Sequence, residues 1–397
     1  TAATADYSTL ADNSAITITG DFNLSGNLTA DTAGTTDSSI TIAGDVTANT
    51  MTIDTNGTGT GNDINLDDAA AGYTLSGNLD LDTSGDTATI DINTDIDATG
   101  NNITINTTGD NATVNQVGNV TANNTLIGTT GASASITRNG TLAGGLSAST
   151  TGLGSDITNT GVISAGAGTV AFVTTQDNAD ILSNDNITAA NITMSTTGDN
   201  ATIDHNADIA VATAANITTN GDGSTLDLTG NVSGAGNLTL RTYDTHSDLT
   251  QTGTVNITGD VLIRTDGRYN DISQIGNITA NNITFTAIKL DSTIAITGDL
   301  IATNDIDISS NLSDSDITLT GNMTAVNASI ITTATTTGNS NITISGGDIN
   351  LTGDLTLSTT GDTSAITQTG GITANNATIS TNGTTSNITL DDNSNTI

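Results

Sequence analysis

The chain has 397 residues and a formal net charge of −37 at pH 7, because its 42 acidic residues, all of them Asp, outnumber five basic residues. This charge excludes nucleic-acid binding, which relies on Lys and Arg at the phosphates. The chain contains no Cys, which excludes a disulfide scaffold and a Cys-based metal site, and its aromatic content of 2% is too low for a thick globular core.

Residues 1–14 do not fit the repeat that follows them, so we expect a short lead segment before a single continuous array over residues 15–397. The chain starts at Thr1 and shows no basic segment followed by an apolar one, which indicates a mature protein or a piece of a larger one. No apolar run approaches the roughly 18 residues of a membrane-spanning helix, so we expect no membrane insertion.

A short motif that begins with an aliphatic residue recurs through residues 15–397. The sixteen intervals between successive copies cover 372 residues, so the mean spacing is about 23 residues, with a range of 21 to 26. A period of this length is typical of solenoids. The first aliphatic residues of the copies are Ile16, Ile40, Ile64, Ile90, Val114, Ile136, Ile157, Ile181, Ile203, Leu226, Leu249, Ile272, Ile294, Ile317, Ile342, Ile366 and Ile388.

Within each copy, aliphatic residues alternate with Thr, Asn or Asp, as in Ile283, Thr284 and Phe285. This alternation predicts short strands with one buried face, and the Gly-Asp, Gly-Asn and Asn-Gly steps between them predict turns. We therefore predict an all-β fold, a parallel β-helix (β-solenoid) of about seventeen coils of about 23 residues, with three short strands per coil. Disorder would fit the composition, but it gives no reason for aliphatic residues to keep their register over the whole array.

Stacked coils place equivalent residues in columns. We expect one buried aliphatic column, flanked by an outward column formed by the residue that follows each of its members. The buried column contains Ile40, Ile64, Ile90, Ile136, Ile157, Ile203, Ile317 and Ile342, and the outward column contains Thr41, Asn65, Asp91, Thr137, Thr158, Asp204, Thr318 and Thr343.

The second inward position of the motif is polar in several copies. Because an unpaired buried Arg is costly, we predict that this position lies at a partly exposed corner, where Gln and Asn side chains stack in ladders. The polar residues at this position are Gln116, Arg138, Asn159, Ser183, His205, Gln251, Gln274 and Gln368.

The stretch GTGNDINLD, residues 59–67, comes nearest to the Gly-rich repeat of calcium-binding β-rolls. Carboxylate, amide and backbone oxygens in such turns are the ligands that Ca²⁺ prefers. We therefore predict Asp63, Asp67, Asp68 and Asp86 as candidate calcium ligands, with solvated turn residues as the alternative interpretation. The predicted fold requires no cofactor.

The sequence does not indicate catalysis. His205 and His246 lie in different copies, without the further ligands that a zinc site needs. Asp pairs occur throughout the array, so none of them marks an acid–base pair for sugar hydrolysis. The narrow range of coil lengths also leaves no long insertion to wall a cleft. We therefore predict that the chain is not an enzyme.

The units GNITANNITFT and STTGDNATID resemble the β-strand repeats of large bacterial surface proteins, namely filamentous-haemagglutinin-like adhesins, autotransporter passengers and S-layer or giant fibre proteins. The resemblance covers residues 15–397 and implies an extracellular, cell-surface structural protein. Such a protein would build a fibre, sheath or layer by head-to-tail or lateral contact with copies of itself. The first alternative is an adhesin stalk that displays a tip outside this chain and contacts surface glycans. The second is a β-helix carbohydrate-active enzyme.

Overall fold

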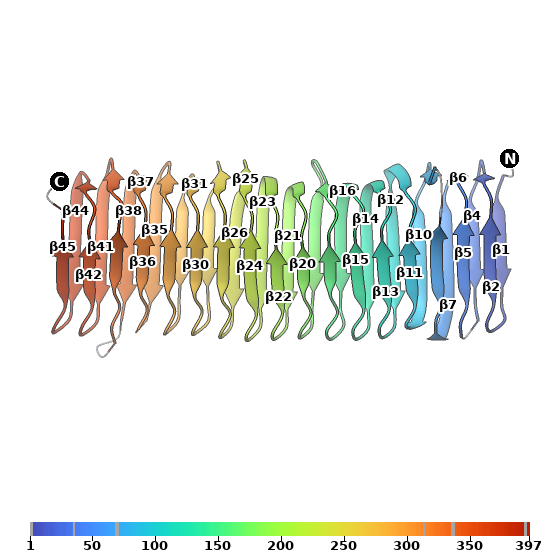
Figure 1. The fold of residues 1–397 in the computed structure, drawn as a ribbon, viewed down its shortest axis with the longest axis horizontal. Helices are drawn as coiled ribbons and strands as arrows, with labels where there is room; N and C mark the ends of the chain where they lie inside the picture. The colour runs from blue at the N-terminus through green and yellow to red at the C-terminus, as the bar shows by residue number, and fades with distance from the viewer. Residues whose placement is uncertain (1–2, 35, 68–70, 313, 335–337, 393–394) are drawn as a thin grey trace. The chain divides into compact units, whose positions relative to one another are not determined.

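The computed structural model describes residues 3–34, 36–67, 71–312, 314–334, 338–392 and 395–397. The chain forms two compact units, residues 1–197 and 198–397. Each unit is a parallel β-solenoid (Figure 1), and strands are the only regular secondary structure that the described residues form. The all-β parallel β-helix predicted from the repeat is therefore confirmed.

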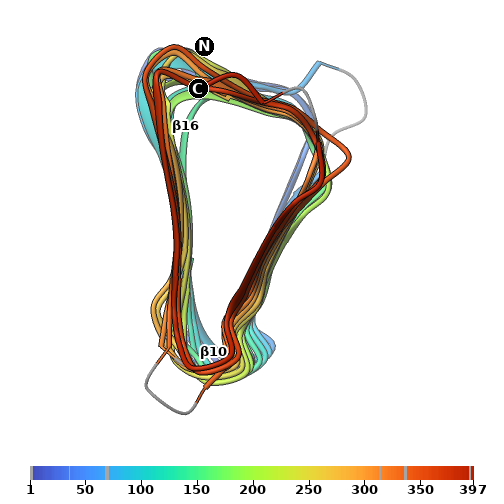
Figure 2. The same cartoon turned by 90° about the vertical axis from the view of Figure 1, so that its left-hand side faces the viewer.

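Each coil contains three strands that belong to two sheets. In one representative coil these are β5 (Ser39–Ala43), β6 (Val46–Ala48) and β7 (Met51–Thr60). The first strand of every coil joins one sheet, and the second and third strands join the other. Within each unit, the coils trace a three-sided path (Figure 2). In several coils the second and third strands merge into one longer strand.

In unit 1, the first strands of the coils are β2 (Ala15–Thr19), β5, β8 (Asp63–Asp67), β11 (Thr89–Ile92), β13 (Thr113–Gln116), β15 (Ser135–Arg138), β17 (Ile157–Asn159) and β20 (Ile181–Ser183). Its other strands are β1 (Ala5–Thr9), β3 (Phe22–Asn23), β4 (Leu28–Thr32), β6, β7, β9 (Tyr73–Leu75), β10 (Leu79–Asp86), β12 (Ile96–Thr108), β14 (Val120–Thr130), β16 (Leu142–Thr150), β18 (Ile163–Ser164), β19 (Thr169–Thr174) and β21 (Ile187–Thr197).

In unit 2, the first strands are β22 (Thr202–His205), β24 (Thr225–Thr229), β27 (Leu249–Thr252), β30 (Ile272–Ile275), β33 (Ile294–Thr297), β36 (Ile317–Thr320), β39 (Ile342–Ser345), β42 (Ala365–Gln368) and β45 (Asn387–Leu390). Its other strands are β23 (Ile209–Asn220), β25 (Val232–Gly234), β26 (Asn237–Tyr243), β28 (Val255–Ile257), β29 (Val261–Thr265), β31 (Ile278–Ala280), β32 (Ile283–Ala287), β34 (Leu300–Ala302), β35 (Asp305–Asn311), β37 (Met323–Ala325), β38 (Asn327–Thr333), β40 (Ile349–Leu351), β41 (Asp354–Thr360), β43 (Ile372–Thr373) and β44 (Asn376–Asn382).

The predicted aliphatic column is present and buried. In unit 1 the register pairs Ile40 with Ile64, and Ile64 with Ile90. In unit 2 it pairs Ile317 with Ile342. The predicted members of this column are at most 1% exposed, whereas the residues that follow them are half-buried or exposed. Alternation along each strand and parallel pairing between coils together produce the core.

The segment before residue 15 also enters the array. Strand β1 pairs in parallel with β4, so that Ala5 lies opposite Leu28 and Thr9 opposite Thr32. Residues 5–9 therefore occupy a third-strand position, one coil before β4. The alternation of Ala, Tyr and Thr in β1 is too weakly apolar to reveal this pairing from the sequence.

Glycine at the turn after the first strand allows the coils to approach closely. Gly276 has φ +119°, and a Cβ at this position would lie 2.3 Å from the carbonyl oxygen of Gly253 in the preceding coil. Any other residue would therefore clash with the neighbouring backbone in a conformation that L-residues rarely adopt.

The turn between the third strand and the next coil is held by small buried hydroxyl residues. Ser247 Oγ donates to the carbonyl oxygen of Gly221, and Thr242 Oγ1 donates to that of Ser247. Ser292 Oγ accepts from the amide of Asn270 in the preceding coil. These bonds satisfy buried backbone groups at the sharpest bend of the coil. They also fix the turn on which the main candidate site lies.

Candidate functional site

Asp and Asn side chains connect successive coils at their corners. The Oδ1 atom of such a residue accepts a hydrogen bond from the backbone amide of the equivalent residue in the next coil. One run in unit 2 passes from Asn277 through Asp299, Asn322 and Asp348 to Gly371, with amide-to-oxygen distances of 2.8, 2.8, 3.0 and 2.8 Å. We call such a run an Asx ladder. Each ladder satisfies turn amides that the strands leave unpaired.

The ladders also determine how carboxylates ionise. Asp222 accepts from both the hydroxyl and the backbone amide of Thr245, and these bonds hold its pKa below the ordinary value. Asp156 likewise accepts from the amide of Asp180, but burial is the larger effect and raises its pKa. Hydrogen bonds to the charged form and desolvation act in opposite directions.

Two of the candidate calcium ligands, Asp63 and Asp86, occupy ladder positions. Asp63 Oδ1 accepts from the amide of Thr89 at 3.0 Å, and Asp86 Oδ1 accepts from that of Asp110 at 3.1 Å. Asp67 Oδ1 accepts from the side-chain amide of Asn93 at 2.8 Å. Asp68 lies outside the described residues. These contacts give Asp63, Asp67 and Asp86 a role in joining coils, and the calcium site stays a prediction.

Two general features of the described segments concern metal ions and membranes. In these segments, no group of three or more His, Cys, Asp or Glu side chains is placed to hold a metal ion. They contain no helix long and apolar enough to cross a membrane.

The polar second inward position differs from the prediction, because it is buried. Its eight polar residues are at most 1% exposed, so this position is part of the core and not a partly exposed corner. The stacking that we expected is present in unit 1. Arg138 Nε donates to Gln116 Oε1 at 2.8 Å, and Arg138 Nη1 donates to Asn159 Oδ1 at 2.5 Å. Asn159 Nδ2 in turn donates to Ser183 Oγ at 3.3 Å.

The two ionisable residues at this position have strongly shifted pKa values. Burial lowers the pKa of Arg138 to about 10, and its guanidinium contacts only neutral acceptors, the third being the carbonyl oxygen of Gly140. Burial also lowers the pKa of His205 to about 4, opposed in part by the backbone of Ala207 and the carboxylate of Asp208. His205 is therefore a neutral core residue at physiological pH.

A column of three carboxylates follows the outer face of the third strands in unit 1. The register places Asp31 opposite Asp54, and Asp54 opposite Asp82. Desolvation and the neighbouring carboxylate of Asp82 raise the pKa of Asp54, and desolvation raises that of Asp82. A shallow pocket near Asp82 continues along the same column, where Gly128 leaves space beside Asn106. The pocket contains one carboxylate and no cation.

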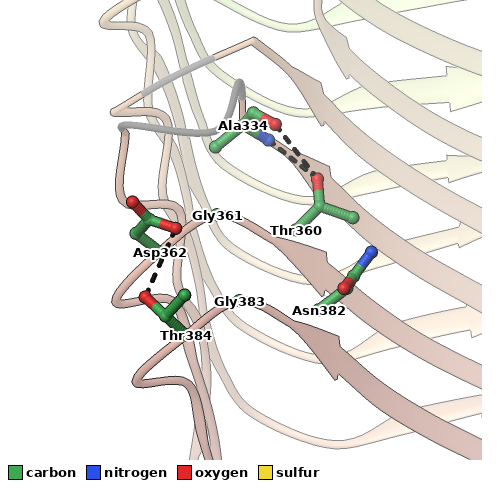
Figure 3. Close-up of a pocket in the computed structure, with 7 residues that line it drawn as sticks. All are labelled: Ala334, Thr360, Gly361, Asp362, Asn382, Gly383 and Thr384. Carbon is green, nitrogen blue, oxygen red and sulfur yellow. Dashed lines mark hydrogen bonds between the residues drawn. The ribbon is translucent and has the colours of Figure 1, made fainter.

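A second pocket, of about 450 Å³, lies at the turns of the C-terminal coils of unit 2 (Figure 3). Its polar groups bond to one another. Thr360 Oγ1 contacts both the amide and the carbonyl oxygen of Ala334, at 3.0 and 3.3 Å. Asp362 Oδ1 accepts from Thr384 Oγ1 at 3.4 Å. These bonds hold adjacent turns together, and Asp362 is the one ionisable residue in the lining.

The most distinctive site is a group of basic and aromatic residues on adjacent coils of unit 2, which we call the Arg–Tyr cluster. It contains four of the five basic residues of the chain and two of its four tyrosines. Its members are Arg241, Tyr243, His246, Arg264, Asp266, Arg268, Tyr269 and Lys289.

Two arginines of the Arg–Tyr cluster share one carboxylate. Arg241 and Arg264 lie directly opposite each other on β26 and β29. Asp266 Oδ1 accepts from Arg264 Nε at 2.6 Å, while Asp266 Oδ2 accepts from Arg241 Nε at 2.6 Å and also contacts Arg241 Nη2. The Arg241 guanidinium also lies 4.0 Å from the centroid of the Tyr243 ring. These contacts fix both arginines and one face of Tyr243.

Two aromatic rings of the cluster stack on the adjoining turn. The rings of His246 and Tyr269 are 5.0 Å apart, with 17° between their planes. Both residues adopt left-handed backbone conformations, with φ of +56° and +59°, where the preceding coils have Asn200 and Gly223. Bulky residues rarely occupy this conformation, whereas Asn and Gly do so at low cost.

An open groove of about 460 Å³ is lined by Tyr243 and by other residues of the Arg–Tyr cluster. Asn220 and Tyr243 lie opposite each other at the ends of the third strands, and Asp266 follows Thr265, which lies opposite Thr242. The next coil is one residue shorter, because Thr265 pairs with Ala287, so Lys289 corresponds to Gly267. A Cβ on Gly267 would lie 1.3 Å from the carbonyl oxygen of Asp244. The groove is lined by Asn220, Tyr243, Asp244, Thr245, Asp266, Gly267, Arg268 and Lys289.

The Arg–Tyr cluster was not predicted from the sequence, because a count of basic residues does not show that four of the five lie on adjacent coils. The signal in the sequence that could have revealed the cluster was the spacing of its residues. Arg241 and Arg264 are one repeat apart, as are His246 and Tyr269. In a solenoid, residues that are one coil length apart in the sequence lie next to each other in space.

Comparison with models of known protein families, with curated proteins and with solved structures finds no match to this chain. The fold itself defines the class. The chain is a β-repeat protein of the parallel β-solenoid type.

Proposed function

We propose that this chain is an extracellular structural repeat protein that contributes to a fibre, sheath or layer at a cell surface by self-association. The observation that supports this function most directly is the continuity between coils. In both units, aliphatic columns, turn hydroxyls and Asx ladders join one coil to the next. Interactions that repeat at every coil suit a mechanical role.

The outer surface supports self-association with copies of the same chain. Outward Thr, Asn and Asp side chains recur in most coils along the first strands, as at Thr318 and Thr343. A second copy carries the same spacing, which favours regular lateral packing. Composition and the resemblance to bacterial surface repeats support a location outside the cell.

Negative-stain electron microscopy and analytical ultracentrifugation of the purified chain at physiological salt test this proposal. We expect filaments, sheets or bundles that grow with protein concentration. Particles that stay monodisperse at every concentration would contradict self-association.

An adhesin stalk is the second candidate function, and the Arg–Tyr cluster is the observation that favours it. A stalk would display a tip outside this chain and would itself contact surface glycans. Monodisperse particles that bind cells or glycans would favour this function over a self-associating fibre.

We expect no catalytic activity. The groove beside the Arg–Tyr cluster contains the carboxylates of Asp244 and Asp266, which is the pairing that sugar hydrolysis uses. However, Asp266 accepts hydrogen bonds from two guanidinium groups, so it is poorly suited to donate a proton or to attack a sugar. Release of products from a polysaccharide panel would overturn this expectation.

A further inference from the structure

We propose that the groove beside the Arg–Tyr cluster binds an acidic saccharide, a chain of pyranose rings that carry carboxylate groups. This inference goes beyond the structural role and does not depend on self-association. It rests on three features of the groove: available cations, an aromatic face and hydroxyl-binding groups.

Two cations of the groove are available to a ligand. The Lys289 ammonium makes no hydrogen bond or ion pair within the described part of the chain, and its side chain is exposed. The Arg268 guanidinium lies 3.6 Å from Asp291 and 5.0 Å from the centroid of the Tyr269 ring, and it donates to the Tyr269 hydroxyl at 3.2 Å. Even so, 46% of its side chain is exposed. By contrast, Arg241 and Arg264 are held by Asp266. Lys289 and Arg268 can therefore bind a carboxylate from the ligand.

An anionic ligand must be held by direct contacts with Lys289 and Arg268, because the chain as a whole does not attract anions. The chain carries a net charge of −37, so most of its surface repels anions. At physiological salt this repulsion decays over about 8 Å, so a short ligand that contacts Lys289 and Arg268 directly can still bind.

An aromatic ring supplies a flat apolar face for a sugar ring. Tyr243 lines the groove and is only partly exposed. Its ring is held by Arg241. The stacked pair of His246 and Tyr269 lies on the adjoining turn, outside the groove lining. The C–H face of a pyranose ring can pack on an accessible aromatic face such as that of Tyr243.

The remaining lining groups distinguish a saccharide from a purely anionic partner. Asn220 and Thr245 offer neutral polar groups, and the exposed Asp244 carboxylate can accept hydrogen bonds from sugar hydroxyls. The same carboxylate would repel the Asp-rich face of a second copy of this chain. The groove volume of about 460 Å³ also lies within the range of small-ligand sites.

Isothermal titration calorimetry of the full chain tests the proposal with three probes at physiological salt. These are a short oligogalacturonate, a neutral oligosaccharide of the same length, and a poly-aspartate peptide of the same charge. We expect saturable binding of the oligogalacturonate alone. Lys289→Gln and Arg268→Gln should each weaken it by about tenfold, since each removes a hydrogen bond between charged groups.

Tyr243→Ala should also weaken binding, by several-fold, whereas Tyr7→Ala provides a matched control that should not. Tyr7 is an exposed tyrosine outside the groove. The far-ultraviolet circular dichroism and melting temperature of each variant must match the wild type, so that a loss of binding reports on the groove. Poly-aspartate binding as tight as that of the oligogalacturonate would overturn the proposal in favour of an acidic protein partner. Absence of saturable oligogalacturonate binding, or binding that the groove variants leave unchanged, would overturn it outright.

Discussion

His205 makes the stability of the solenoid depend on pH. Burial holds its pKa at about 4, against about 6.5 for an unperturbed histidine. Between these values the unfolded chain binds a proton that the folded chain excludes, so stability is lost as the pH falls from about 6.5 to about 4. The maximum loss is on the order of 3 kcal/mol.

We expect His205→Gln to remove most of this loss, because Gln251 and Gln274 occupy the same inward position in other coils. Urea unfolding measured between pH 7 and pH 4 checks the prediction. His246→Gln, at an exposed turn, should retain the dependence seen in the wild type. Identical pH dependence in the two variants would contradict the assignment to His205.

Arg138 allows a test of how much the hydrogen bonds of a buried polar side chain contribute to stability when its partners are neutral. Replacing it by Gln removes a poorly solvated charge and retains an amide that can bond to Gln116 or Asn159. Replacing it by Leu leaves the acceptor oxygens of both neighbours without their donor. We therefore expect Arg138→Leu to be less stable than Arg138→Gln by about 1–3 kcal/mol, as measured by urea unfolding. Equal stability of the two variants would show that the hydrogen bonds contribute nothing net.

At the scale of the strand and turn, the Asx ladder explains why the acidic residues at the corners are Asp. An Asp or Asn oxygen reaches the amide of the next coil directly from a turn, as a short side chain does in an Asx turn. The longer Glu side chain would lose more rotamer freedom to hold the same position. The preference for Asp at these corners therefore follows from the corner geometry.

One ladder position offers a direct test. Asp271 Oδ1 accepts from both the amide and the hydroxyl of Thr293, at 2.8 and 2.7 Å. We expect Asp271→Ala to destabilise this turn by about 1 kcal/mol and to speed hydrogen exchange at the Thr293 amide. Asp271→Asn should stay close to the wild type. Asp227→Ala, which removes a carboxylate in the middle of strand β24, should leave exchange at Thr293 unchanged. Slow exchange at Thr293 in Asp271→Ala would contradict the ladder role.

The sequence was most informative about structural features that a single coil determines. Alternation within a copy was enough to predict the buried column around Ile64 and Ile317, since a strand has only two faces. The sequence was misleading at Arg138, because its acceptors are supplied by Gln116 and Asn159 in the neighbouring coils. The free-energy cost of burying a polar residue can be assessed only together with the residues about one repeat before and after it, because they can supply its hydrogen-bond partners.

The same reasoning applies to the candidate site. Arg264 and Asp266 are close in sequence, but the site exists because Tyr243 and Lys289 lie one coil to either side. A search for basic and aromatic residues separated by one repeat would have found the cluster from the sequence alone. The left-handed backbone of His246 and Tyr269 required the structure, because bulky residues here replace the Asn200 and Gly223 that mark this turn position in the preceding coils.

At the scale of the whole molecule, association depends on the balance between repeated lateral faces and charge. A net charge of −37 amounts to about two negative charges per coil, so copies repel one another. At low ionic strength this repulsion extends over tens of ångströms, whereas at physiological salt it decays within about 8 Å. Calcium has a further effect, because one ion can be coordinated by carboxylates of two chains.

We therefore expect calcium chloride to promote association more strongly than sodium chloride at the same ionic strength, and a chelator to reverse the difference. Light scattering of the purified chain in the three conditions measures this. Equal scattering with calcium and sodium would assign association to screening alone. A chain that stays monomeric in all three conditions would remove the physical basis for a self-associating fibre, and the stalk would then be the better description of its role.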